Sequence, residues 1–120
     1  MTNWLDGVIE EMKNPIEVSV GHLGLKDAEG ETIESLQVLP LSANEFQVLK
    51  GHPDMKKLKG YEERAERLGL LVTFEMLRKC DKSITLAKFK QLPLQLLNDL
   101  STAIMGATKG TDGDADPLSE

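Results

Sequence analysis

The side chains that could act as nucleophiles or metal ligands are few and widely spaced in this sequence. The 120 residues include one cysteine, Cys80, and two histidines, His22 and His52. Zinc sites use close ligand sets such as C-x-x-C or H-E-x-x-H, and neither pattern occurs. Cys80 would need a histidine brought to it by the fold, and a small buried hydrophobe near a helix end is the simpler interpretation. We therefore predict no metal site and no cofactor.

The carboxylates form no pattern typical of catalysis either. Glu62, Glu63 and Glu66 lie among Arg64 and Arg67, which indicates solvated i,i+4 pairs on a helix. The segment DGDAD near the C-terminus lacks the closing glutamate of an EF-hand loop, and the glycines of GHLGLKDAEGE lack phosphate-loop spacing. The sequence therefore predicts that the chain is not an enzyme.

Composition and charge predict a soluble single domain in a reducing compartment. Hydrophobic residues make up 40% of the chain, charged residues 28%, and the net charge is −6. A lone cysteine excludes an intrachain disulfide, the acidic N-terminal segment is unlike a signal peptide, and no apolar run reaches the length of a membrane span. Residues 50–90 hold eleven basic and six acidic residues, which indicates either a partner surface or a solvated helix face. We expect a cytoplasmic protein that binds neither nucleic acid nor membrane.

Residues 1–14 are expected to form an amphipathic helix. At about 100° per residue, one side gathers a set of apolar residues, namely Trp4, Leu5, Val8, Ile9 and Met12. Pro15 bars continuation of the helix. A terminal helix of this kind packs either against its own domain or against a neighbouring molecule.

The next segment predicts a β-hairpin. Apolar and polar residues alternate over 16–20 and again over 35–38, and Gly30 is the turn residue best able to take a positive φ. Pro40 ends the second strand. An isolated hairpin is marginal, so we expect it to pack on helices or to add to another sheet.

Three to four helices are expected after the hairpin. Ser42 and Glu45 form an S-x-x-E capping box for the first, and residues 54–80 form the longest helical pattern. Pro93 suits the first turn of the last helix, which Gly106 can close. The expected fold class is therefore α+β, with the hairpin and helices in one domain over 15–106. Residues 107–120 are expected to be a disordered acidic tail.

The longest helix is apolar on two nearly opposite sides. Such a helix either lies centrally, between the hairpin and another helix, or leaves one side for a partner. Our candidates for partner binding begin with the shorter stripe of this helix, Leu70, Phe74 and Leu77. Apolar residues of the terminal helices follow, namely Leu97, Ile104 and Trp4.

The order of these pieces resembles a phage tail assembly chaperone over about residues 16–106. The hairpin ends in VLPLSANEF, a V-x-P-L-S-x-x-E-F type of segment. A charged and then leucine-rich helix follows and finishes near an aspartate in LLVTFEMLRKCDKSIT, and a leucine-proline helix start closes the pattern in QLPLQLLNDLSTAI. The combination of these motifs carries the resemblance.

The resemblance implies a non-catalytic role in building a long-tailed virion. Proteins of this family bind the tape measure protein, a very long helical chain that aggregates if left bare, until tail tube subunits polymerise around it. They act in the host cytoplasm, are not retained in the mature virion and often form homo-oligomers. In several members a ribosomal frameshift appends a second domain that recruits the tail tube protein, and this chain would be the short form.

Two other classes of function remain open at this point. A structural virion component, such as a tail tube or tail completion protein, normally carries more strand than this sequence predicts. A small DNA-binding regulator would use the basic segment and the helix-turn-helix look of residues 42–80, but the overall acidity and the lack of a basic recognition helix weigh against it.

Overall fold

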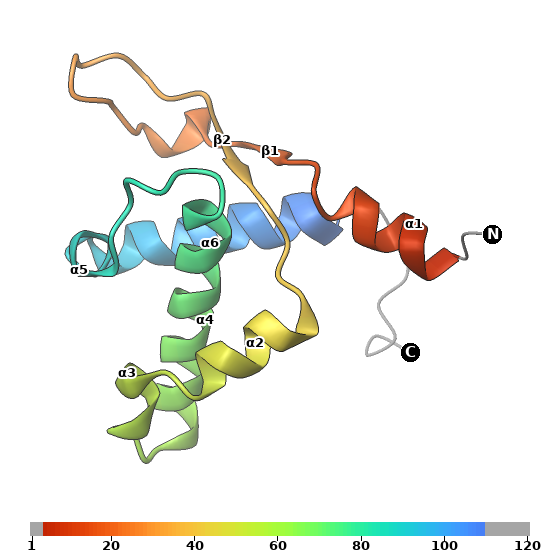
Figure 1. Ribbon diagram of the computed structural model, residues 1–120. Helices are drawn as coiled ribbons and strands as arrows, with labels where there is room; N and C mark the ends of the chain where they lie inside the picture. The colour runs from red at the N-terminus through yellow and green to blue at the C-terminus, as the bar shows by residue number, and fades with distance from the viewer. Residues whose placement is uncertain (1–3, 110–120) are drawn as a thin grey trace.

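The computed structural model describes residues 4–109 of the chain and has the α+β class that the sequence predicts (Figure 1). The elements in chain order are α1 (Trp4–Glu11), β1 (Ile16–Ser19), the 3-10 helix η1 (Gly21–Leu23), β2 (Ser35–Val38), α2 (Ala43–Lys50), α3 (Pro53–Lys56), α4 (Tyr61–Arg78), α5 (Leu86–Phe89) and α6 (Leu94–Lys109). The predicted order of helix, hairpin and helices is confirmed.

The two strands pair antiparallel, in a register that places Ile16 opposite Val38 and Val18 opposite Leu36. Val18 and Val38 face the interior and are fully buried, as the alternation predicted. Residues 20–34, which we call the hairpin arm, extend the hairpin beyond its strands. The arm is held by an isolated bridge between Lys26 and Thr32, and it turns at Gly30, whose φ of 86° is the predicted positive one.

The main core lies where the hairpin packs on α4 and α6. β1 contacts α6, β2 contacts α4, and α4 crosses α6, as Figure 1 shows. The buried residues of this core are Val18, Val20, Val38, Phe74, Met76, Leu77, Phe89, Leu97, Leu100 and Ile104. A second core cluster of Leu49, Met55 and Leu71 joins α2 and α3 to α4. α4 is therefore the central helix of the domain.

The joint between β2 and α2 is short and rigid. The side chain of Ser42 accepts a hydrogen bond from the Glu45 amide at 3.1 Å, and the Glu45 carboxylate accepts one from the Ser42 amide at 2.7 Å, which confirms the capping box. Lys79 of the α4 C-terminus donates to both Glu45 and the Pro40 carbonyl at 2.8 Å. The proline stop and the helix start are thus tied to the end of the central helix.

Two predicted boundaries are wrong. The helical pattern over 54–80 divides into α3 and α4 because the chain turns between them, with Gly60 extended at φ −76° and ψ 144° as the N-cap of α4. α6 continues beyond Gly106 to Lys109, since Ala107 still packs against the main core. The rest of the predicted tail, 110–120, lies outside the described residues.

Candidate functional site

Four of the residues predicted to bind a partner are core residues, and this overturns the reasoning behind that prediction. Phe74 is 8% exposed and its ring lies 5.7 Å from that of Phe89, centroid to centroid. Leu77, Leu97 and Ile104 are buried in the same core. The domain covers both sides of α4, because α6 and the hairpin lie on one and α2 and α3 on the other. These side chains are therefore not available to a client in this conformation.

The two remaining candidates differ from each other. Leu70 is half-buried and packs against both core clusters, so its contacts lie within the domain. Trp4 is 78% exposed, and α1 contributes no buried residue. Of the predicted set, Trp4 is thus the side chain that the fold leaves open to a partner.

The structure contains an apolar groove that the sequence did not indicate. It has a volume of about 370 Å³ and lies between the hairpin, α5 and the start of α6. Its apolar lining consists of Leu25, Ile33, Leu36, Leu77, Ile84, Phe89, Leu92, Leu96 and Leu100. We call this the hairpin groove. Phe89, Leu77 and Leu100 are its buried floor, and the other apolar lining residues are half-exposed walls.

Local hydrogen bonds hold the walls of the hairpin groove. On the hairpin arm, the Ile33 amide donates to the Leu25 carbonyl at 2.8 Å, which sets both side chains at one level of the arm. On the opposite wall, the Ile84 amide donates to the Asp81 carbonyl at 3.2 Å, and Thr85 caps α5 through the Lys88 amide. The walls are therefore ordered by hydrogen bonds that do not involve the apolar side chains.

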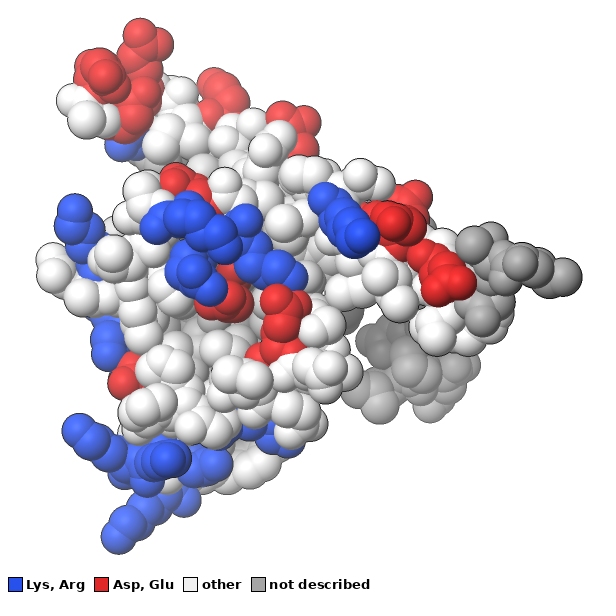
Figure 2. All heavy atoms as spheres, in the orientation of Figure 1, with Lys and Arg blue, Asp and Glu red and all other residues white. Residues whose placement is uncertain are grey.

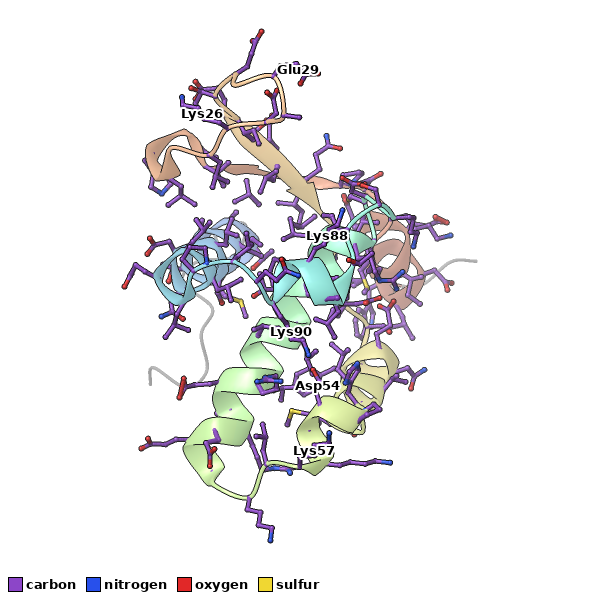
Figure 3. All side chains as sticks on the ribbon, turned by 90° about the vertical axis from the view of Figure 1, so that its left-hand side faces the viewer. Lys26, Glu29, Asp54, Lys57, Lys88 and Lys90 are labelled. Carbon is purple, nitrogen blue, oxygen red and sulfur yellow. The ribbon has the colours of Figure 1, made fainter. Side chains whose placement is uncertain are left out.

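The rim of the groove is basic. Lys26 on the hairpin arm and Lys88 on α5 belong to its lining, and none of the described residues that line it is acidic. Figure 3, which views the molecule from the α5 side, shows Lys26 on the arm and Lys88 below it. Lys26 also donates to the Thr32 hydroxyl at 3.1 Å. The groove thus combines an apolar floor with cations at its edges.

Charge is separated along the molecule. Figure 2 shows acidic side chains at the tip of the hairpin arm, where Asp27, Glu29 and Glu31 lie, and basic ones at the opposite end. Lys57 and its neighbours in the turn between α3 and α4 form the basic end. The hairpin groove opens between these two ends.

A cluster of charged side chains joins α3 and α4 to the turn after α5. Asp54 accepts a hydrogen bond from Lys90 at 2.7 Å and one from Arg67 at 3.3 Å (Figure 3). The hydrogen bond from Lys90 holds the pKa of Asp54 below its ordinary value. His52 caps α3 by accepting the Asp54 amide at Nδ1, 3.0 Å away. These contacts give His52 and Asp54 structural roles.

The candidate nucleophile is in an unfavourable setting. Cys80 is half-buried near the end of α4, and burial raises the pKa of its thiol, so the reactive thiolate is disfavoured. Within residues 4–109, no group of three or more His, Cys, Asp or Glu side chains could hold a metal ion. No helix in this described part is long and apolar enough to cross a membrane.

The groove was missed because its walls come from segments with weak sequence signals. Leu25 and Ile33 flank a polar turn, and Ile84 and Leu92 flank a four-residue helix, so none belongs to a long periodic pattern. The usable signal is the spacing of Leu25 and Ile33 on either side of Glu29, from which each is four positions away: two apolar residues at matched distances from the centre of a turn lie on one side of a hairpin.

Searches against known protein families, curated proteins and solved structures found no match to this chain.

Proposed function

We propose that this chain is a non-catalytic tail assembly chaperone of a long-tailed phage or prophage. It binds the tape measure protein in the host cytoplasm, keeps it soluble during tail tube assembly and leaves before the virion matures. The observation that carries the proposal is the hairpin groove, an open apolar groove on a chain whose net charge is −6. The order of motifs from VLPLSANEF to QLPLQLLNDLSTAI supports the same conclusion.

The groove suits a helical client. An amphipathic helix lays its apolar face into a hydrophobic groove, and anchors at i, i+3, i+4 and i+7 fill it. The floor of Phe89, Leu77 and Leu100 supplies the apolar contact, and Lys26 and Lys88 can pair with carboxylates on the polar edges of such a helix. The net charge of −6 keeps the chaperone and its bound client dispersed.

The client contact therefore moves from the stripe of Leu70, Phe74 and Leu77 to the groove walls. A long helical client offers many apolar segments, so several copies of the chaperone can line up along one chain. Recruitment of tail tube subunits belongs, by the same resemblance, to a frameshifted longer form.

Co-expression with a tape measure protein, the client named in the proposal, is the test. We expect the tape measure to stay soluble and to purify with the chaperone. Replacing Ile33, a half-exposed wall residue, with Asp places a charge in the groove, so the client should fall into the insoluble fraction.

Val48→Asp is the matched control. Val48 is 73% exposed on α2 and does not line the groove, so this variant should hold the client as the native chain does. Melting curves must show that both variants remain folded. A folded Ile33→Asp chain that still solubilises the tape measure would rule out the groove as the client site.

A further inference from the structure

α1 has an apolar face that no other part of the described range 4–109 covers. Trp4, Leu5, Val8 and Ile9 are 78%, 48%, 48% and 47% exposed, and they lie on one side of the helix. An isolated helix of eight residues is marginal in water, because nucleation is costly and few hydrogen bonds repay it. Packing against another surface would stabilise α1 and remove this apolar face from water.

The hairpin groove, elsewhere in the same domain, is an open apolar surface that can accommodate the apolar face of such a helix. Its half-exposed walls leave space of about 370 Å³, which is on the scale of sites that accept large side chains. An indole and a neighbouring aliphatic side chain can pack against the aromatic ring and the leucine side chains that form the floor of this groove.

The charges of the two surfaces are complementary. The end of α1 carries Glu10 and Glu11 and no basic residue, while the described rim of the groove carries Lys26 and Lys88 and no acid. Glu10 pairs with Lys13 at 3.3 Å, but both side chains are more than two-thirds exposed, so Glu10 can exchange partners. Such rim charges contribute mainly to orientation and association rate, and the apolar face supplies the affinity.

α1 and the groove of the same chain lie on opposite sides of the domain. Figure 1 shows α1 on the right, α5 on the left, and the sheet and α6 between them. α1 joins β1 at Ile16, the end of the hairpin away from the arm, through the short segment 12–15. A second molecule can present its groove to α1 without any change in this connection.

We infer that α1 of one copy docks in the hairpin groove of a second copy of this chain, with Trp4 as its anchor. Reciprocal exchange closes a two-fold dimer, and one-way exchange builds an open chain. This association needs no client. If the groove also binds the tape measure, as proposed above, then α1 and the client compete for one site, and each client helix displaces a neighbour's α1.

Trp4 is the single tryptophan of the chain, so its fluorescence reports directly on this contact. One short helix makes a small interface, so we expect the association to be weak. The measurement therefore dilutes the full chain from about 1 mM to about 1 µM, which covers the dissociation constants of weak complexes. We expect the emission to be blue-shifted at high concentration and to move to the wavelength of a solvated indole on dilution. Sedimentation should show the matching change from oligomer to monomer.

Two variants separate the two halves of the contact. Trp4→Asp removes the anchor and leaves the groove intact, whereas Ile84→Asp keeps α1 and places a charge in the groove wall. Each variant alone should associate at least about tenfold more weakly than the native chain. Mixing them restores one intact pair, so the remaining Trp4 emission should shift to the blue only in the mixture.

Lys88→Glu, at an exposed rim position, serves as a second groove variant in case Ile84→Asp does not fold. It should weaken association several-fold and lose most of the salt dependence. A blue-shifted Trp4 at every dilution would mean that α1 docks on its own chain and would overturn the inference. So would a solvated Trp4 at every concentration, or a mixture of variants that stays monomeric.

Discussion

α1 and α6 are amphipathic helices at opposite ends of the described chain, but they differ in whether their apolar faces are buried. Leu97, Leu100 and Ile104 of α6 are buried in the main core, whereas every residue of α1 is exposed. The difference comes from neighbours: α6 packs on β1 and α4, and α1 has no contact of that extent with any other element in residues 4–109. An apolar stripe therefore shows that a face needs covering, but not whether the same chain covers it.

The largest expected effect contrasts two aromatic residues. Phe74→Asp buries a charge in the main core without a partner, so the free energy of unfolding should fall by several kcal/mol and the domain should unfold. Trp4→Asp should leave the melting temperature of the dilute, monomeric chain within about 2 °C of native. Far-UV circular dichroism measures both variants. A stable Phe74→Asp chain would show that α4 is not the central helix.

Two isoleucines sharpen the comparison at the next level. Ile104 is 1% exposed in α6 and Ile9 is 47% exposed in α1. Ile104→Ala should cost about 2–5 kcal/mol, because it removes buried methyl groups and leaves a cavity. Ile9→Ala should change monomer stability by less than about 0.5 kcal/mol. Urea unfolding at low protein concentration gives both values, and equal losses would mean that α1 packs on its own domain.

How far the sequence predicts this molecule follows from which interactions are local. The capping box of Ser42 and Glu45, the turn at Gly30 and the strand alternation depend on residues close in sequence, and all three are confirmed. Whether the apolar stripe that contains Phe74 is covered depends on the packing of α6 and the hairpin, and no local sequence pattern indicates this packing. The groove walls at Leu25 and Ile84 are likewise 59 positions apart in sequence, and only the tertiary fold brings them together.

Ion pairs in the body of the domain provide a third contrast with the exposed N-terminal segment, and the expected effect is smaller. The pairs in question join one helix to another. Lys79 and the Ser42 amide hold the pKa of Glu45 below its ordinary value, and Lys90 does the same for Asp54. A folded-state pKa below the unfolded one stabilises the domain above the ordinary carboxylate range. That stability is lost as pH falls through the folded pKa, so it should decline from about pH 5 downward.

Lys79→Met tests this origin of the acid sensitivity. The variant should lose about 1 kcal/mol of stability at neutral pH and show a shallower decline below about pH 5. Urea unfolding across a pH series measures both. Lys13→Met is the matched control, since its pair with Glu10 is exposed and lies within the N-terminal segment. An unchanged slope in Lys79→Met would place the acid-sensitive group elsewhere.

The smallest expected effect uses two glycines inside helices, Gly7 of α1 and Gly69 of α4. Beyond the adjoining residues and the backbone of its own helix, a Cβ at either position would meet no described atom within 4 Å, so alanine fits both. Gly69→Ala should raise the free energy of unfolding by about 0.5 kcal/mol and the melting temperature by about 3 °C, because alanine loses less backbone entropy in a helix. Gly7→Ala should leave the melting temperature of the monomer unchanged while increasing the helical signal of α1. By favouring the helix that docks, it should also tighten self-association by about twofold. If both substitutions raised the melting temperature equally, α1 would unfold together with α4. The distinction between a helix that its own domain covers and a helix that it leaves exposed for a second copy would then be wrong.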